Sequence, residues 1–382
     1  MKIILINNLY PPYQKGGAEK IVELTAQGFR EEGHEVTIIT SKPPSGEKIE
    51  AEQDIYHLSS LYYHLDKIPK PLRLFWHVWD LVNWKNYIAL KKILKKENPD
   101  LVITHNLKGI GGLTAKALRK KRIKHIHTLH DIQLLHPSGL IIKGQEKILS
   151  SGLTKLYIRI GRLLWRSPDL VISPSHWLLD LHKERRFFPD SLKKTIRNPL
   201  PNKKTKSSIK KEGDFFNFLY VGQLEKHKGI DFLISAFEKD PLPKSRLIVI
   251  GRGSEEEDLK ESASRDRVFF LGSKDKEGVE ELMRKADCLI VPSLCYENSP
   301  TVIYEAIQAG LPVLASDLGG IPELSQKGMV ELFIPEDKKD LIIKMKEIKN
   351  NYDYYRKRAE RKKQELKTPD KREYCRKLIF LI

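Results

Sequence analysis

The chain has 382 residues, which is enough for two ordinary α/β domains, each with its own hydrophobic core. Hydrophobic residues make up 40% of the sequence and charged residues 31%, which excludes a disordered or a membrane-spanning protein. The 68 basic residues outnumber the 50 acidic ones and give a net charge of +18. A charge of this size attracts phosphate-bearing partners such as nucleotides, nucleic acid or anionic lipid.

The N-terminal residues and the cysteines indicate the compartment. Residues 1–7 are too few for a signal peptide and lack a cleavage site, so we interpret them as a first buried strand. Cys288, Cys295 and Cys375 are unevenly spaced and form no metal-binding pattern, so no disulfide is expected. We therefore expect the protein in the cytoplasm.

The first strand begins a βαβ unit. A loop over residues 8–18 leads into a predicted helix at 19–32 and a strand at 35–40. The loop lacks the G-x-G-x-x-G spacing of a dinucleotide site, which disfavours a nicotinamide cofactor. Gly16 and Gly17 instead allow the backbone to approach a ligand at the start of the helix, although a simple turn would also use two glycines.

The next segment combines tryptophan with basic residues. Residues 44–70 are predicted to be irregular, and the pattern over 71–96 predicts one helix whose polar face is rich in lysine. Such a face is typical of a core helix with a solvated side, and it is also compatible with lying on an anionic membrane.

Three histidines follow in the next α/β unit. Strands are predicted at 100–104 and 125–129, with a helix at 112–122 between them. His125 and His127 share one face of a strand, and together with His130 they resemble a metal-ligand set. No further histidine or cysteine at ligand spacing completes that set, so the metal interpretation is weak.

A composition change marks a domain boundary. After a strand at 170–173 and a helix that opens at 174–177, the chain enters a polar, lysine-rich run at 202–214. A buried strand is then predicted at 216–221, followed by a glycine turn and Lys228, a combination typical of a phosphate site.

The clearest pattern lies at 289–316, where strand, loop, helix and strand follow one another. Ser299 is a favoured N-cap residue, Pro300 suits the first helical position, and Gly310 suits a left-handed residue after the helix. The predicted helix has about 10 residues. Such a unit is a parallel crossover.

Two glutamates accompany this helix, Glu297 before it and Glu305 within it. The free amides of Thr301 and Val302 and the positive end of the helix dipole can hold an anion such as a diphosphate. Glu305, beside a nucleotide, is suited to accept hydrogen bonds from a ribose diol. The alternative is that both glutamates are ordinary solvated residues.

The whole run resembles the retaining glycosyltransferases of the GT-B type, the group 1 / family 4 enzymes that include sucrose synthases and bacterial mannosyltransferases. Their hallmark is Glu, seven residues, Glu, as at Glu297 and Glu305, and the flanking Pro-Ser, Ala-Gly-Leu-Pro-Val and 316–323 (Ser-Asp-Leu-Gly-Gly-Ile-Pro-Glu) also match. The resemblance implies an α/β fold of two Rossmann-like domains with parallel sheets facing across a cleft. It implies an acceptor-side domain at 1–199, to which a last helix at about 366–382 returns, and a nucleotide-sugar-binding domain at 200–365.

The resemblance also assigns roles to residues. The catalytic residues implied are Glu297, His130 and Lys228. Glu297 orients the hydroxyls of the sugar, and His130 lies near the transferred sugar. Lys228 stabilises the negative charge of the diphosphate. The donor-binding residues implied are Gly16, Gly17, Gln223, Ser299, Thr301, Val302 and Glu305. Gln223 stands where the family has an arginine, so one positive charge is missing.

The implied reaction is transfer of a sugar from a nucleotide donor, such as a UDP- or GDP-sugar, to a hydroxyl of a saccharide or lipid-linked acceptor, with retained configuration. No D-x-D motif occurs in the sequence, so neither a metal nor another cofactor is expected. An epimerase or hydrolase of the same fold is one alternative, and a noncatalytic basic module on membrane or nucleic acid is another. The sequence shows no nucleic-acid-reading element, which disfavours nucleic acid as a partner.

Overall fold

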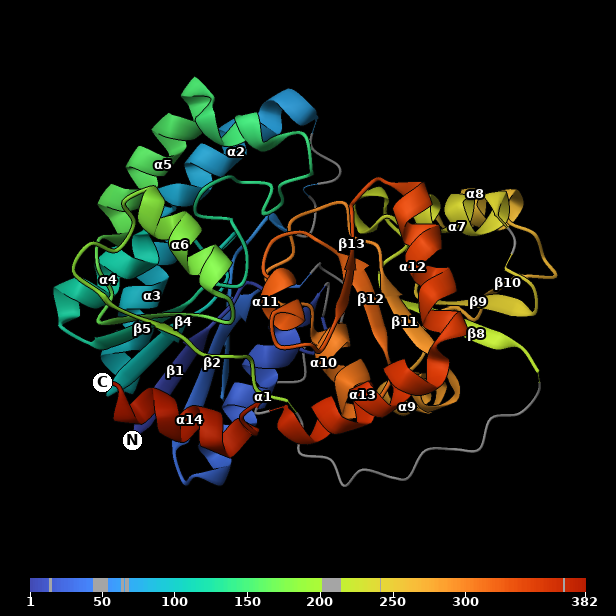
Figure 1. Cartoon of the computed structure of the whole chain (residues 1–382). Helices are drawn as coiled ribbons and strands as arrows, with labels where there is room; N and C mark the ends of the chain where they lie inside the picture. Colours follow the sequence, from blue (N-terminus) through green and yellow to red (C-terminus); the bar gives the residue numbers. More distant parts are fainter. Residues whose placement is uncertain are drawn as a thin grey trace. The chain divides into compact units, whose positions relative to one another are not determined.

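The computed structural model describes residues 1–13, 16–43, 54–62, 65, 69–200, 214–240, 242–366 and 368–382. The chain forms two compact units (Figure 1). The first comprises Met1–Leu140, Glu146–Asn202 and Thr368–Ile382, and the second comprises Ile141–Gln145 and Lys203–Lys367. Most of the lysine-rich run at 202–214 lies outside the described residues.

The first unit is built on a parallel sheet of seven strands in the order β3-β2-β1-β4-β5-β6-β7. The strands are β1 (Lys2–Ile6), β2 (Glu35–Ser41), β3 (Ile55–Leu58), β4 (Leu101–Thr104), β5 (Lys124–Thr128), β6 (Leu170–Ser173) and β7 (Leu192–Thr195). Its helices are α1 (Gly17–Glu31), α2 (Lys70–Leu81), α3 (Trp84–Glu97), α4 (Leu113–Lys121), α5 (Gly152–Trp165), α6 (His176–Glu184) and α14 (Lys371–Phe380). The order reverses between β1 and β4, and ligands of open α/β sheets bind beyond the carboxyl ends of strands at such a point.

The second unit has a parallel sheet of six strands in the order β10-β9-β8-β11-β12-β13. The strands are β8 (Phe216–Val221), β9 (Ser245–Ile250), β10 (Val268–Phe270), β11 (Cys288–Val291), β12 (Val313–Ser316) and β13 (Glu331–Phe333). Its helices are α7 (Ile230–Lys239), α8 (Glu256–Ser262), α9 (Lys276–Lys285), α10 (Thr301–Gln308), α11 (Pro322–Ser325), α12 (Lys338–Asn350) and α13 (Tyr352–Glu365). Here the order reverses between β8 and β11. The prediction of two Rossmann-like parallel sheets is confirmed.

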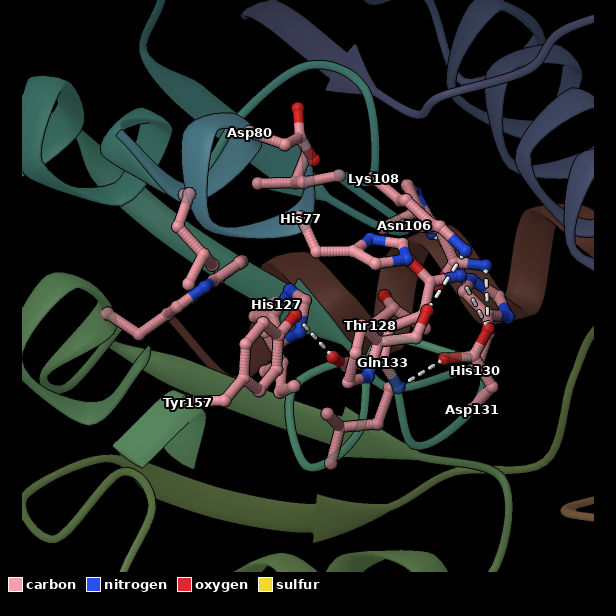
Figure 2. A pocket seen from close by; sticks show the side chains of 18 residues that line it. His77, Asp80, Asn106, Lys108, His127, Thr128, His130, Asp131, Gln133 and Tyr157 are labelled. Carbon is pink, nitrogen blue, oxygen red and sulfur yellow. Dashed lines mark hydrogen bonds between the residues drawn. The ribbon is translucent and has the colours of Figure 1, made fainter. Parts of the chain in front are cut away.

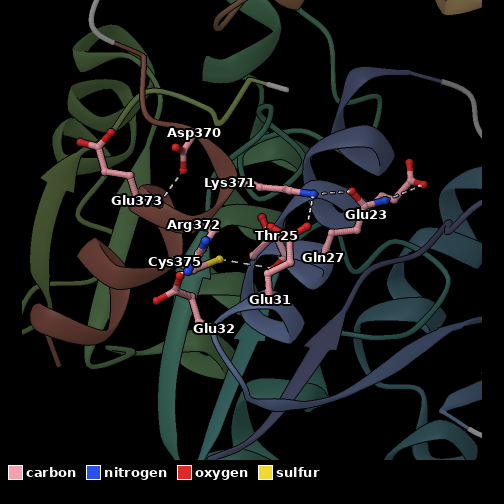
Figure 3. Close-up of polar contacts among 10 residues, drawn as sticks. All are labelled: Glu23, Thr25, Gln27, Glu31, Glu32, Asp370, Lys371, Arg372, Glu373 and Cys375. Carbon is pink, nitrogen blue, oxygen red and sulfur yellow. Dashed lines mark hydrogen bonds and ion pairs between the residues drawn. The ribbon is translucent and has the colours of Figure 1, made fainter. Parts of the chain in front are cut away.

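The last helix returns to the first unit, as the resemblance implied, and packs along α1 (Figure 3). Lys371 pairs with Glu31 at 2.5 Å, and the Cys375 thiol donates to the Thr25 carbonyl at 3.4 Å. Close packing requires Gly28 in α1, because a Cβ there would lie 2.4 Å from the Lys371 carbonyl oxygen. Residues of α14 thereby complete the core that β1, β2, β4, β5 and β6 share.

The single helix predicted over 71–96 is wrong, because the structure has two helices there, α2 and α3. The helical conformation is interrupted at Val82–Asn83. There the Asn83 side chain accepts a hydrogen bond from the Asn86 amide at 3.1 Å and so caps α3. The apolar periodicity continues through this break, so periodicity alone could not locate it. No helix in the described part of the chain is both long and apolar enough to cross a membrane.

Candidate active site

Two loops meet in the second unit where its strand order reverses. Lys228 ends the loop after β8 and Glu297 lies in the loop after β11, and the Lys228 Nζ is 2.6 Å from the Glu297 Oε1. The Ser293 hydroxyl donates to the same oxygen at 3.0 Å. The loops approach closely because residue 229 is glycine: it has a φ of +70°, and a Cβ there would lie 2.0 Å from the Pro292 carbonyl oxygen.

The Lys228–Glu297 pair is charged. Burial by itself lowers the pKa of Lys228, but the neighbouring Glu297 carboxylate outweighs it and raises that pKa above its ordinary value. Burial likewise favours a protonated Glu297, but the Lys228 ammonium and the Ser293 hydroxyl bring the pKa of Glu297 below its ordinary value. At neutral pH the site therefore presents an ammonium and a carboxylate in contact.

The backbone of Glu297 is held by the glycine run at 319–320, which the sequence analysis used only as a family mark. The Gly320 amide donates to the Glu297 carbonyl at 2.8 Å. Gly319 has a φ of +66°, and a Cβ there would lie 2.1 Å from the same carbonyl oxygen. Sequence reasoning missed Ser293 and Gly319 as contacts of Glu297, and the paired glycines were the available signal.

Helix α10 follows this loop, and its start differs from the prediction. Pro300, with an extended ψ of 119°, occupies the N-cap position, and no side chain caps the helix. The Ser299 hydroxyl instead donates to the Tyr304 hydroxyl at 2.9 Å. Ser299 is therefore not the N-cap, because the extended Pro300 delays the first helical residue to Thr301.

The first turn of α10 retains the donors that an anion needs. No described group accepts a hydrogen bond from the amide of Thr301 or Val302. Glu305 lies half-buried one turn further along the helix. Gly310 adopts the expected left-handed conformation, with a φ of +68°. Gln223 is exposed, and its backbone carbonyl accepts a hydrogen bond from the Tyr220 hydroxyl at 2.6 Å.

In the first unit, Gly16 and Gly17 form the start of α1. Gly16 precedes the helix in an extended conformation, and its amide donates to the Glu19 carboxylate at 3.0 Å. Gly17 is the first helical residue, and both glycines are exposed. The Glu19 side chain thus satisfies the Gly16 amide.

His130, labelled in Figure 2, lies two residues beyond the end of β5. It contacts a histidine that sequence reasoning missed. Its Nε2 is 2.9 Å from the Nδ1 of His105, which follows β4. Burial lowers the pKa of His130 to about 4 and that of His105 well below its ordinary value. Both imidazoles are therefore neutral at pH 7, so His130 can offer a hydrogen bond but no charge.

The other two histidines of this region belong to the sheet. His125 Nε2 and His127 Nδ1 lie 2.7 and 2.9 Å from the Thr104 hydroxyl, and both rings are buried. In the described ranges no group of three or more histidine, cysteine or acidic side chains is arranged to hold a metal ion. His125 and His127 accordingly pack as strand residues.

His105 and His130 line a small cavity of about 40 Å³ in the first unit, and Figure 2 labels His130 there. Asp80 and Asp131 also line it, and burial raises the pKa of Asp80 to about 7 and that of Asp131 to about 6. The Asp80 carboxylate accepts from the Gly109 amide at 2.8 Å. A cavity of this volume has room for a few water molecules and is too small for a sugar ring.

Comparison with known proteins identifies the family of the chain. Residues 15–201 match the model of Glycosyltransferase Family 4, and residues 201–365 match that of Glycosyl transferases group 1. An uncharacterized 42.6 kDa protein in the cps region of Klebsiella pneumoniae is 31% identical over 89% of this chain and 91% of its own length. The putative teichuronic acid biosynthesis glycosyltransferase TuaC of Bacillus subtilis is 25% identical over 88% of this chain and 86% of its own.

Among solved structures, HepE of Anabaena in complex with UDP has a similar fold. Its TM-score is 0.72 at 19% sequence identity, and the likeness covers 100% of this chain and 99% of that one. The two matched family models together extend from residue 15 to residue 365, across both units. The chain therefore belongs to the group 1 / family 4 glycosyltransferases and has the GT-B fold.

Proposed function

We propose that this glycosyltransferase moves a hexose from a nucleotide-sugar donor to an acceptor hydroxyl with retention of configuration, in the synthesis of a cell-surface glycan or glycolipid. The observation that carries the proposal is the charged Lys228–Glu297 pair together with the free amides at the start of α10, where Thr301 follows Glu297 by four residues. This combination suits a donor that carries both a diphosphate and a sugar. The ammonium and the amides can bind the diphosphate, and the Glu297 carboxylate can accept hydrogen bonds from the hydroxyls of the sugar.

The donor is proposed to bind to the second unit. The Lys228 ammonium and the amides of Thr301 and Val302 hold the diphosphate, with Ser299 and the Gln223 side chain beside it. Glu305 accepts hydrogen bonds from the ribose, and Glu297 accepts them from the hydroxyls of the sugar. The Anabaena relative bound to UDP supports a uridine nucleotide among the candidates.

The proposed step exchanges one bond to the anomeric carbon for another on the same face. The bond from the anomeric carbon to the diphosphate oxygen breaks, and the acceptor oxygen bonds to that carbon. The proton of the acceptor hydroxyl passes to the departing diphosphate. Negative charge grows on the diphosphate as the bond breaks, so Lys228 stabilises the transition state more than the ground state. No metal or other cofactor is included in this step.

The first unit, which includes the returning α14, is proposed to present the acceptor. His130 contributes a neutral imidazole near the transferred sugar, and Gly16 and Gly17 allow the donor phosphates to approach the start of α1. The relatives from a cps region and from teichuronic acid biosynthesis support a saccharide or lipid-linked acceptor. We place the enzyme in the cytoplasm, in peripheral contact with an anionic membrane.

The test combines labelled nucleotide sugars with a lipid extract and with soluble saccharides from bacterial cells. Label that enters a product only when donor and acceptor are both present supports transfer. Donor isomerised or hydrolysed at full rate without an acceptor contradicts it. The anomeric configuration of the product, read by NMR coupling constants, decides between retention and inversion.

A further inference from the structure

Helix α5 of the first unit carries two exposed stripes of opposite character. Leu153, Leu156 and Leu163 are 63, 54 and 65% exposed, a large apolar surface for one helix that no described segment covers. At 100° per residue these leucines lie within about 80° of one another on the helix surface. The helix is anchored through Thr154, Ile158, Gly161 and Trp165, which form its buried face.

The second stripe is basic. Lys155, Arg159 and Arg162 follow the spacing i, i+4 and i+7, so they lie in one row between the buried face and the leucines, and Arg166 directly follows the end of the helix. All four residues are exposed. An exposed apolar row beside a basic row on one helix is the pattern of an element that lies in the plane of a membrane interface.

The basic row and Arg166 line a groove of about 1190 Å³. Arg185 and Arg186, which follow α6, also line it, as does the apolar Pro189. The groove thus collects six basic residues against two acidic ones, Glu184 and Asp190.

Most of the positive charge in this groove is not neutralised by the protein. Glu184 lies 3.5 Å from Arg185, and Asp190 bonds the Ser167 hydroxyl. Within the described ranges no carboxylate forms an ion pair with Lys155, Arg159, Arg162, Arg166 or Arg186. Five like charges that the fold holds together without an ion-paired carboxylate favour an anionic partner.

We propose that the α5 groove binds the phosphate headgroups of anionic phospholipids while Leu153, Leu156 and Leu163 enter the boundary between headgroups and acyl chains. The combination selects this partner: arginines alone would serve any polyanion, whereas three exposed leucines beside them need an apolar phase. This inference rests on the membrane contact proposed above and assigns that contact to the α5 groove. Vesicle binding needs neither donor nor acceptor, so its measurement is independent of transfer activity.

Co-sedimentation of the full chain with vesicles tests the proposal. We expect binding to equal parts of phosphatidylglycerol and phosphatidylcholine, and little binding to phosphatidylcholine alone. Arg159→Glu, Arg162→Glu and Arg166→Glu together should weaken the apparent Kd about a hundredfold, because each basic residue at an anionic surface contributes about fivefold. The second variant combines Leu153→Ser, Leu156→Ser and Leu163→Ser. It should still bind vesicles at low salt, but it should lose the vesicle binding that the unmodified protein retains at high salt, because salt screens only the charges.

A charge-matched variant on α3, Lys91→Glu with Lys92→Glu and Lys95→Glu, separates this groove from the general charge of the molecule. These lysines are also exposed, and they lie in the basic stretch that the sequence singled out. A loss of binding at α3 equal to that at α5 would overturn the proposal, as would wild-type binding by the α5 arginine variant. Unchanged thermal unfolding and nucleotide binding of each variant show that the fold is intact.

Discussion

At the scale of single residues, Lys228 is the side chain whose charge the proposed reaction uses most directly. Lys228→Ala should lower kcat about 100-fold or more and change KM less, because the charge on the diphosphate grows as the bond breaks. Steady-state kinetics with a verified donor measures the split. Lys226→Ala is the control, since Lys226 lies two residues away in the same turn, with its side chain 80% exposed. Full activity of the Lys228 variant would move the diphosphate site elsewhere.

Glu305 tests the nucleoside end of the same site. Glu305→Ala should weaken nucleotide binding by about 1 to 3 kcal/mol for each ribose hydrogen bond that is lost. Isothermal titration with UDP and GDP gives the affinity directly. Glu277→Ala, at an exposed position of α9, should leave it unchanged. Equal affinities of the Glu305 variant and the unmodified protein would remove this residue from the site.

Asp80 predicts a dependence of stability on pH. Its ordinary pKa of 3.8 applies to the unfolded chain, and burial raises it to about 7 in the folded protein. The folded state therefore holds this proton more tightly, so the free energy of unfolding falls as pH rises from about 4 to about 7. Asp80→Asn keeps an acceptor for the Gly109 amide and removes the titration.

The Asp80→Asn variant should therefore gain stability over the unmodified protein as pH rises, by at most about 4 kcal/mol above pH 7. Denaturant unfolding at pH 5 and pH 8 measures the two differences. A stability difference that is the same at both pH values would show that Asp80 titrates normally in the folded protein.

Some contacts of the site residues depend on tertiary structure that sequence patterns do not contain. The placement of Lys228 and Glu297 after two strands was predictable from buried apolar runs and glycine turns. Their contact needs the strand order of the second sheet, in which β8 and β11 are neighbours although 66 residues separate Val221 from Cys288. The same holds for His105, which contacts His130 only because β4 and β5 pair in parallel.

At the scale of elements, the turn at 319–320 is predicted to set the position of the loop that bears Glu297. Gly319→Ala should lower transfer activity, because its Cβ would lie 2.1 Å from the Glu297 carbonyl oxygen and displace that loop. Gly328→Ala is the matched control. Gly328 has the same φ of +66°, and the nearest atom to a Cβ there is a flexible lysine carbon at 3.4 Å.

Both substitutions should cost about 1 to 2 kcal/mol of stability, because each forces a side chain into the left-handed region. Only Gly319→Ala should also reduce kcat, which steady-state assays of the two purified variants compare. Equal activity of the two would mean that Glu297 keeps its position without the glycine turn.

The elements that sequence patterns predicted best are those with strong punctuation. Gly310 correctly predicted the end of α10, whereas Ser299 as N-cap and Pro300 as first helical residue predicted a start one residue before the observed one at Thr301. The sequence analysis did not identify α5 or β7. The polar Leu192–Thr195 of β7 gave no apolar strand pattern, and it forms a strand because it pairs in parallel with β6.

At the scale of the whole molecule, the two units have separate cores. One centres on β1, β4, β5 and β6 with α1 and α14, and the other on β8, β9 and β11 with α7 and α12. Because a ligand stabilises only the structure that binds it, a nucleotide bound to the second unit should raise that unit's resistance to unfolding and leave the first unit nearly unchanged.

Hydrogen exchange in the presence and absence of a nucleotide tests this expectation. At a concentration 100 times its Kd, a nucleotide should stabilise the second unit by about 2.7 kcal/mol, so amides of β8, β11 and β12 that exchange by unfolding of that unit should slow about 100-fold. Amides of β1 and β4 serve as the internal control in the same sample. Equal slowing in both sheets would mean that the two units unfold as one, or that the nucleotide contacts both. Slowing confined to the first sheet would reverse the assignment of the donor to the second unit.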